Sequence, residues 1–233
     1  MFQAAAGEFL TQANQAIVAR GKFTVALSGG STPRGLFGVL ASGEIPSIPW
    51  DKIFFWWSDE RHVPPADPES NYRMADEAML SKVPVPAGNV FRVRAEEKDA
   101  GVAASEYEQT MRRFFALRPG EFPRFDLIYL GIGPDGHTAS LFPGSAGLEE
   151  KSRLVIANWI EKFKTDRITF TYPVLNASAG VTFLVSGPDK APIVREALEN
   201  PGRGLPCQQV RPGNGRLLWL LDRAAASALS AEK

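Results

Sequence analysis

The sequence has little cysteine, little histidine and no net charge. Among its 233 residues, Cys207 is the single cysteine and only two residues are histidines. An intrachain disulfide and a metal site built on cysteines are therefore excluded, and histidine ligation of zinc has little support. Because 26 basic side chains balance 26 acidic ones, we expect no broad basic face for nucleic acid or for an anionic membrane.

Long apolar runs are also absent from the sequence. No stretch approaches the roughly 20 residues that a membrane-spanning helix needs, and no basic start followed by an apolar core opens the chain. We therefore expect no signal peptide, no membrane partner and a cytoplasmic location. Hydrophobic residues make up 44% of the chain, which is enough for a sizeable core, and the length favours one α/β domain over residues 1–233.

Segments typical of strands alternate with segments typical of helices along the chain. Strands are predicted at residues 23–27, 53–57, 89–94, 125–130, 168–171, 181–185 and 217–221. Helices are predicted at residues 2–20, 33–40, 71–80, 100–117, 173–179, 190–198 and 224–229. The alternation predicts a mainly parallel sheet with helices on both faces, that is, a three-layer αβα fold. The Gly- and Pro-rich segment 200–216 is predicted to be a surface loop.

The most informative segment follows the predicted strand at 125–130. Residues 131–144 read GIGPDGHTASLFPG and contain His137. An open parallel sheet places its ligand where a strand ends in such a turn, and histidine is the side chain best suited to proton transfer near neutral pH. We therefore predict that His137 is a catalytic base, although a packed or helix-capping histidine is the ordinary alternative.

The glycines of this turn also match a dinucleotide-binding fingerprint. Gly131, Gly133 and Gly136 fit the spacing G-x-G-x-x-G. A genuine fingerprint opens a helix at once and is followed by an acidic residue at the end of the next strand. Here Pro134 interrupts the turn, and the next apolar run ends at Asn158. We therefore expect no nicotinamide or flavin cofactor at this turn.

A turn of small residues between a predicted strand and a predicted helix is a candidate anion site. It precedes Pro33 and consists of Ser28, Gly29, Gly30, Ser31 and Thr32. Small residues let the backbone approach a ligand, and a helix N-terminus, here with Thr32 as the predicted N-cap, favours an anion. A tight turn without a ligand fits the pattern equally well.

Charged residues elsewhere could complete such a site. After the strand at 53–57 the chain reads Asp59, Glu60, Arg61, His62. A charge run of this kind is usually a solvated loop, but its position at the end of a strand suits a site. Arg167 and Lys190 could hold a phosphate, Arg as a two-pronged donor and Lys as a point charge, although each alone is more often a surface cation.

Taken together, these segments resemble the 6-phosphogluconolactonase family, which is related to glucosamine-6-phosphate deaminases. The matching segments are residues 26–33, 59–64, 70–71, 131–143, 167–176 and 183–190. Where the deaminases have Asp-Glu-Tyr, this chain has Asp-Glu-Arg at residues 59–61. Lactonases often have Lys-Pro-Pro before Arg-Ile-Thr, whereas residues 161–166 read EKFKTD, so the roles of Lys162 and Lys164 stay open.

The resemblance implies a Rossmann-like sheet of the sugar-phosphate isomerase/deaminase type. It also implies hydrolysis of 6-phosphoglucono-1,5-lactone to 6-phosphogluconate, a step of the oxidative pentose phosphate pathway, without metal or cofactor. His137 would then be the general base and Asp135 would orient it. Arg61 would stabilise the oxyanion or hold the phosphate, and Asp59 would hold a sugar hydroxyl or fix Arg61.

The 6-phosphate would be held by Ser28, Gly29, Gly30, Ser31, Thr32, Arg167 and Lys190. The expected partner is the small sugar-phosphate lactone, and a monomer is expected rather than an oligomer. A deaminase or isomerase acting on an amino-sugar phosphate and a non-catalytic sugar-phosphate sensor remain as alternatives.

Overall fold

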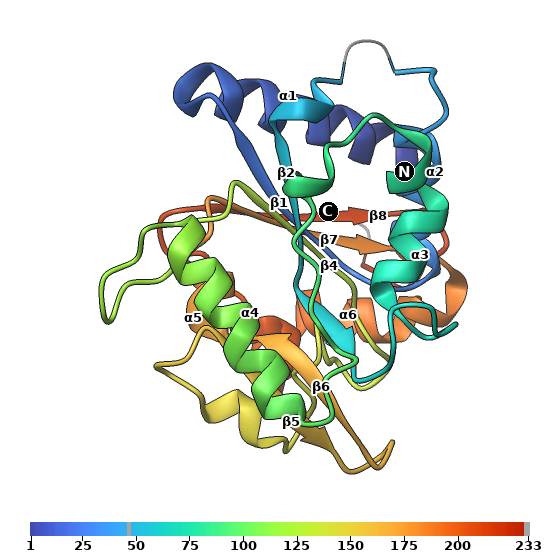
Figure 1. The fold of residues 1–233 in the computed structure, drawn as a ribbon. Coiled ribbons are helices and arrows are strands. Elements are labelled where there is room, and N and C mark those ends of the chain that lie inside the picture. The colour runs from blue at the N-terminus through green and yellow to red at the C-terminus, as the bar shows by residue number, and fades with distance from the viewer. Residues whose placement is uncertain (46–47, 231–233) are drawn as a thin grey trace.

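A computed structural model describes residues 1–45 and 48–230 of the chain. Its centre is a five-stranded sheet with the order β2-β1-β4-β7-β8, in which all neighbouring strands run parallel (Figure 1). The strands are β1 (Phe23–Leu27), β2 (Ile53–Trp57), β4 (Leu127–Leu130), β7 (Gly180–Val185) and β8 (Arg216–Leu221). Every residue of β1, β4 and β7 is buried, as expected for inner strands of a parallel sheet with both faces covered.

Helices cover both faces of this sheet (Figure 1). One face packs against α1 (Phe2–Arg20), α2 (Ser31–Leu40) and α3 (Asn71–Ala78). The other packs against α4 (Ala100–Phe114), α5 (Tyr172–Ala177) and α6 (Ala191–Glu199). Successive strand residues point to opposite faces, so Val25 lies in the first core and Ala26 in the second. The predicted three-layer α/β fold is confirmed.

The chain also forms a smaller antiparallel sheet that the sequence analysis does not predict. Its order is β3-β6-β5, with β3 at Asp59–Arg61, β5 at Val155–Ile160 and β6 at Thr165–Phe170. A single residue, Ser58, separates the end of β2 from the start of β3, so the chain passes directly from the parallel sheet into the smaller one. β5 and β6 form a hairpin whose turn spans residues 161–164.

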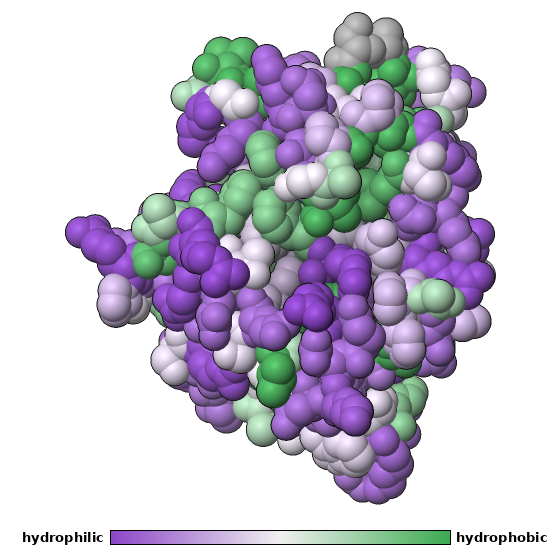
Figure 2. Space-filling model, viewed as in Figure 1, coloured by the Kyte–Doolittle hydropathy of each residue, from purple (hydrophilic) through white to green (hydrophobic). Residues whose placement is uncertain are grey.

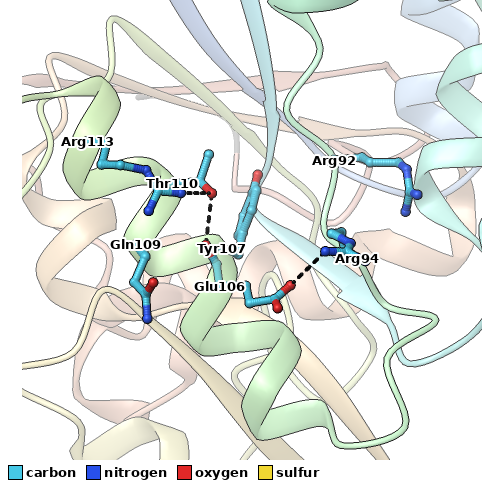
Figure 3. A pocket seen from close by; sticks show the side chains of 7 residues that line it. All are labelled: Arg92, Arg94, Glu106, Tyr107, Gln109, Thr110 and Arg113. Carbon is cyan, nitrogen blue, oxygen red and sulfur yellow. Dashed lines mark hydrogen bonds and ion pairs between the residues drawn. The ribbon is translucent and has the colours of Figure 1, made fainter.

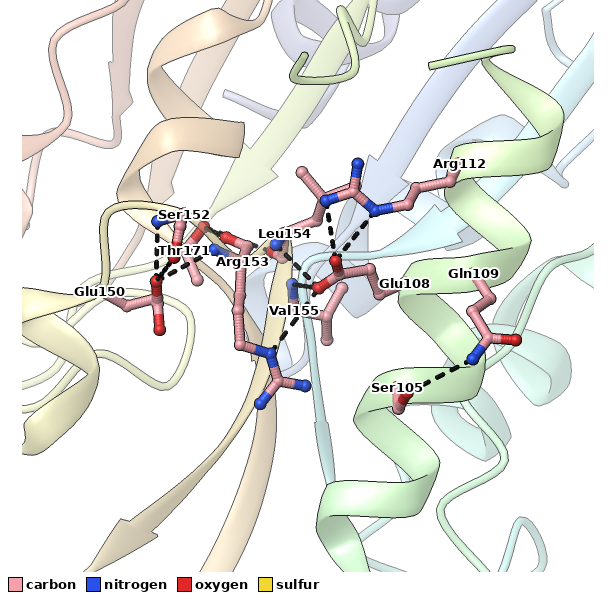
Figure 4. A network of polar contacts seen from close by, with 10 residues as sticks. All are labelled: Ser105, Glu108, Gln109, Arg112, Glu150, Ser152, Arg153, Leu154, Val155 and Thr171. Carbon is pink, nitrogen blue, oxygen red and sulfur yellow. Dashed lines mark hydrogen bonds and ion pairs between the residues drawn. The ribbon is translucent and has the colours of Figure 1, made fainter. Parts of the chain in front are cut away.

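Glu108 on α4 attaches the smaller sheet to the rest of the fold (Figure 4). Its Oε2 atom accepts hydrogen bonds from the backbone N–H groups of Leu154 and Val155, at 2.9 and 3.2 Å, where β5 begins. Its Oε1 atom pairs with Arg112 at 2.9 Å, one helical turn further along α4. The start of β5 is therefore held by a charged, partly buried acceptor rather than by apolar contacts alone.

Three local predictions are wrong. Residues 89–94 form no strand, since only Val90 pairs with Phe55 as an isolated bridge. Residues 224–229 form turns rather than a helix. Thr32 is not an N-cap: α2 begins at Ser31 with Gly30 as its cap. Segment 200–216 lies only partly at the surface, because Cys207 and Val210 are buried.

Hydrophilic residues cover most of the face shown in Figure 2, apart from a band of apolar residues across its middle. Within the described ranges, none of the helices has the length and apolar character needed to span a membrane.

Candidate active site

The predicted site segments meet around one cavity of about 270 Å³ at the carboxyl edge of the parallel sheet. Its walls come from residues 28–30 after β1, from Asp59 and Arg61 of β3 together with Asn71, from residues 131–134 and 137–139 after β4, and from Lys190 after β7. Parallel strands bring their carboxyl ends to one edge, and ligands of open α/β sheets bind there. The sheet therefore gathers residues that are far apart in sequence, from Ser28 to Lys190, at one site.

His137 and Asp135 form a couple within the turn after β4. The Nδ1 atom of His137 lies 2.5 Å from Oδ1 of Asp135, and the backbone N–H of His137 donates to the same oxygen at 3.2 Å. The imidazole also stacks on Phe142, with ring centroids 3.8 Å apart. Because Nδ1 faces the carboxylate, Nε2 is the nitrogen available for proton exchange with a molecule in the cavity.

Glycines shape the turn that holds this couple. The Gly136 backbone has φ 78°, a left-handed conformation that glycine adopts without strain. Gly133 leaves room for the imidazole: a Cβ atom there would lie 2.0 Å from the Nδ1 and Cε1 atoms of His137. The glycine spacing that resembles a dinucleotide fingerprint thus serves to seat a histidine.

Burial and charge act in opposite directions on His137. Burial disfavours the charged imidazolium and lowers the pKa of His137, and the hydrogen bond and charge of Asp135 only partly offset this effect. The pKa of His137 is therefore below its ordinary value. For Asp135, burial by itself would raise the pKa, but the hydrogen bond from His137 and its charge outweigh it, so the pKa of Asp135 is lowered. The couple is a neutral imidazole beside a carboxylate near neutral pH.

Asp59 lines the cavity from the start of β3, and a hydrogen bond fixes its carboxylate. The residue is only 7% exposed, and its Oδ2 atom accepts a hydrogen bond from the Ser140 hydroxyl at 2.8 Å. Ser140 is fixed in turn, because its carbonyl accepts from the side chain of Asn158 at 2.8 Å. One carboxylate oxygen of Asp59 is thus occupied, and the other is left for a ligand.

Glu60 is structural rather than part of a solvated charge run. It is 2% exposed. It accepts hydrogen bonds from the backbone N–H groups of Arg61, Asn71 and Tyr72 at 2.7, 2.7 and 2.8 Å, and from the Ser70 hydroxyl at 3.1 Å. Burial raises the pKa of Glu60, and these backbone donors oppose the rise. The buried carboxylate therefore ties β3 to the start of α3.

Asn71 is a cavity residue that the sequence analysis does not single out. Its side-chain amide donates to the carbonyl of Asp59 at 3.0 Å, and it contacts the first turn closely, since a Cβ on Gly29 would lie 1.8 Å from its Oδ1 atom. The available signal was its place in a segment matching the family. Nothing in that segment indicated that the side chain faces the cavity.

Three predicted cations lie at or beside the cavity. Arg61 and Lys190 line it. Arg167 lies opposite Arg61 in the pairing of β3 with β6, is 9% exposed, and has an Nη1 atom that is buried without a hydrogen-bond partner in the described part of the chain. Burial, followed by the charge of Arg61, lowers the pKa of Arg167. Two guanidinium groups held side by side favour a bound anion.

Other predicted residues lie further from the cavity. Ser31 and Thr32 are outside its lining, and the Thr32 hydroxyl instead contacts the Ser186 hydroxyl at 2.8 Å. His62 contacts the carbonyl of Glu97 through Nε2 at 2.7 Å, whereas His137 contacts the carboxylate of Asp135. Of the five residues predicted in the first turn, only residues 28–30 line the cavity.

The two lysines of the β5–β6 turn differ in position. The Nζ atom of Lys162 lies 3.9 Å from Oδ2 of Asp135. Lys164 pairs instead with Glu161 within the turn and is exposed. The hairpin thus brings one of its lysines, and not the other, to the His137 couple.

A second pocket, of about 310 Å³, lies between residues 92–94 and α4 (Figure 3). Its arginines are already engaged: Arg94 pairs with Glu106 at 3.3 Å, and Arg113 donates to the Thr110 hydroxyl at 3.2 Å. Tyr107 is buried, and its hydroxyl contacts the backbone of Trp57. This pocket contains neither a histidine nor an acid–base couple, so the first cavity is the candidate active site.

Known proteins share both the sequence and the fold. Residues 1–219 match the family described as glucosamine-6-phosphate isomerases/6-phosphogluconolactonase. A 6-phosphogluconolactonase of Nostoc sp. is 44% identical over 223 residues, which cover 95% of this chain and 90% of that protein. A 6-phosphogluconolactonase of Synechocystis sp. is 41% identical over 94% of this chain and 90% of its own length.

Solved structures of related proteins also match the fold of this chain. The crystal structure of 6-phosphogluconolactonase from Thermotoga maritima has a TM-score of 0.81 and 31% identity, covering 95% of each chain. A monomeric glucosamine-6-phosphate deaminase has a TM-score of 0.78 at 22% identity, covering 97% of this chain and 95% of that one, and shows the shared fold alone. The predicted resemblance is confirmed, and the chain belongs to the family of glucosamine-6-phosphate isomerases and 6-phosphogluconolactonases.

Proposed function

We propose that this protein hydrolyses 6-phosphoglucono-1,5-lactone to 6-phosphogluconate in the cavity beside His137. The observation that carries the proposal is that His137, which lies 2.5 Å from Asp135, lines the same cavity as Arg61 and Lys190. A hydrolase for an anionic lactone needs a base for water and cations for the phosphate, and this cavity offers both. Relatives at 41% and 44% identity carry the name 6-phosphogluconolactonase.

In the proposed reaction, Nε2 of His137 removes a proton from a water molecule whose oxygen attacks the lactone carbonyl carbon. The bond from this carbon to the ring oxygen then breaks, and the ring oxygen takes the proton from the imidazolium. The product is one ring-opened molecule that carries both the new hydroxyl group and a carboxylic acid, which ionises in solution. Asp135 holds the ring through Nδ1 and stabilises the imidazolium while it exists.

The 6-phosphate is assigned to the cationic side of the cavity. Arg61 lines the cavity, and Arg167 is its neighbour across the β3–β6 pairing. Neither guanidinium has a carboxylate within ion-pair distance among residues 1–45 and 48–230, so a phosphate dianion would relieve the repulsion between them. Lys190 and the backbone of residues 28–30, at the N-terminus of α2, add further donors.

Asp59 is assigned to a sugar hydroxyl. Its Oδ2 atom is occupied by Ser140, and the carboxylate lines the cavity between Arg61 and the His137 turn. An ionised carboxylate accepts hydrogen bonds well and cannot donate them. It therefore suits the hydroxyl groups of a sugar lactone and disfavours a second phosphate at that end of the cavity.

We test the base with His137→Ala, assayed for 6-phosphogluconate from fresh lactone against spontaneous hydrolysis. We expect loss of most of the activity above background, a decrease of about 100-fold or more, with binding of the sugar phosphate retained. His62→Ala is the matched control, because the other histidine contacts Glu97 instead. Near-normal turnover of the His137 variant would remove this residue from the reaction.

A second variant, Arg167→Ala, tests the phosphate assignment. It should raise KM and leave kcat nearly unchanged, since the lost contact is to a part of the substrate that does not react. An unchanged KM would contradict the assignment. Release of ammonia from glucosamine 6-phosphate would instead favour the deaminase alternative.

The protein is proposed to act as a cytoplasmic monomer on this small molecule, without nucleic acid. All four walls of the cavity come from one chain, so a partner subunit is not needed to complete it. Sedimentation at several concentrations tests the monomer, and localisation of the tagged protein tests the compartment.

A further inference from the structure

The β5–β6 hairpin reaches the His137 couple through two side chains at its tip. Phe163 packs edge-on against Phe142, with ring centroids 5.8 Å apart. Phe142 in turn stacks on the imidazole of His137. Lys162 brings its ammonium group to 3.9 Å from Oδ2 of Asp135. The hairpin tip thus contacts both Phe142, the ring that supports His137, and the carboxylate of Asp135.

The carboxylate of Asp135 is shared between two cationic or protonatable groups. Oδ1 faces Nδ1 of His137 at 2.5 Å, and Oδ2 faces Lys162. The negative charge of Asp135 favours the imidazolium, whereas the positive charge of Lys162 opposes it. The ammonium group beside Oδ2 therefore reduces the extent to which Asp135 stabilises the imidazolium.

We propose that Lys162 is a positioning residue for the base: its ammonium group holds the free oxygen of Asp135 and limits how strongly the carboxylate favours the protonated state of His137. This inference rests on the proposed function, in which the neutral imidazole is the reactive form. Lys164, two residues away, has no such role because it pairs with Glu161 in the turn.

The charges around His137 are few, which makes the effect of one lysine measurable. Asp135 and Asp59 favour the imidazolium, and Lys162 disfavours it. The remaining charged groups that line the cavity are Arg61 and Lys190. Lys162 has 59% of its side chain exposed, so its interaction is screened by water and salt.

The experiment uses the fact that the chain has only two histidines. Their ring Cε1–H signals are followed by NMR against pH in the wild type, in Lys162→Gln and in Lys164→Gln. We expect the pKa of His137 to rise by about 0.3 to 0.5 pH units in Lys162→Gln at low ionic strength and less at high salt. His62 is the internal reference and should not move, and Lys164→Gln should match the wild type.

The kinetic readout follows from the same shift. Near the wild-type pKa of His137, kcat/KM of Lys162→Gln should fall about 1.5- to 2-fold, and well above that pH it should equal the wild-type value. Lys162→Arg keeps the charge and should restore the wild-type profile. Because Lys162 is exposed, these variants should unfold at the wild-type temperature.

The outcomes separate this inference from the proposed function. An unshifted His137 pKa in Lys162→Gln, or an equal shift in Lys164→Gln, would overturn the role of Lys162 whatever the activity. A shifted pKa with an unshifted pH profile would retain the charge coupling and reject His137 as the base, and the positioning role would fall with it.

Discussion

A methyl group on Gly133 would stand 2.0 Å from the Nδ1 and Cε1 atoms of His137. Real Cβ atoms do not approach other atoms so closely, so the imidazole can lie beside Asp135 only if residue 133 has no side chain. The position of the base thus depends on a glycine four residues earlier, in the segment that superficially matches a nucleotide-binding pattern.

Gly133→Ala should therefore displace the imidazole from Asp135. We expect kcat/KM to fall by about 100-fold or more, because misplacement of a reactive group by about 1 Å has an effect of that order. The steady-state assay with fresh lactone measures it. Gly202→Ala is the matched control, since a Cβ there meets no atom within 4 Å, and equal activity of the two variants would contradict the steric dependence.

The pH profile of the wild type should reflect the lowered pKa of His137. Burial is the main cause of this lowering, so the imidazole stays neutral, and able to accept a proton, to a pH below its ordinary value of about 6.5. As the pH falls through this lowered pKa, the base becomes protonated and kcat/KM should decline. A profile of kcat/KM against pH with its acid limb above pH 7 would be incompatible with this environment.

Arg61→Gln should distinguish between phosphate binding and stabilisation of the oxyanion. Because Arg61 lies beside Arg167, we expect KM to rise by about 10- to 100-fold, as for loss of a charge-assisted hydrogen bond, with kcat within about threefold of the wild type. Arg92→Gln is the control, since Arg92 pairs with Glu96 at 2.7 Å outside the cavity. A large loss of kcat at constant KM would assign Arg61 to the oxyanion.

Glu60→Gln should destabilise the fold. The glutamine side chain has one acceptor oxygen in place of two and adds a donor group where buried N–H groups converge. We expect a loss of about 1–3 kcal/mol in the free energy of unfolding, measured by urea denaturation. Glu77→Gln, at an exposed residue paired with Arg73, should leave the free energy of unfolding nearly unchanged. An equally small change for Glu60→Gln would show that its hydrogen bonds add little.

The inner strands of the parallel sheet were predictable because they are buried on both faces. Residues 23–27 and 181–185 are apolar except for one threonine in each, a pattern that depends little on which neighbour they pair with. β3 was not predictable in this way. Its residues are Asp, Glu and Arg, which are poor strand formers in isolation, and they are extended because β6 pairs with them and buried donors surround Glu60.

The sequence was enough to name candidate residues in the loops, but it did not show which of them contact one another. His137 and Asp135 are two positions apart, so their contact is local and follows from the turn. Asn71 reaches the cavity from α3, and Lys162 reaches Asp135 from a hairpin of the smaller sheet. The roles assigned to these side chains remain predictions for the variants described above.

The sequence by itself determined the alternation of strands and helices, the turn that presents His137 and the family to which the chain belongs, because these depend on local pattern and on residues a few positions apart. Only the tertiary structure decided that Arg61 faces Arg167, that Ser140 holds Asp59, and that Lys162 rather than Lys164 reaches Asp135. These contacts join segments far apart along the chain, and their geometry is set by how the two sheets pack together.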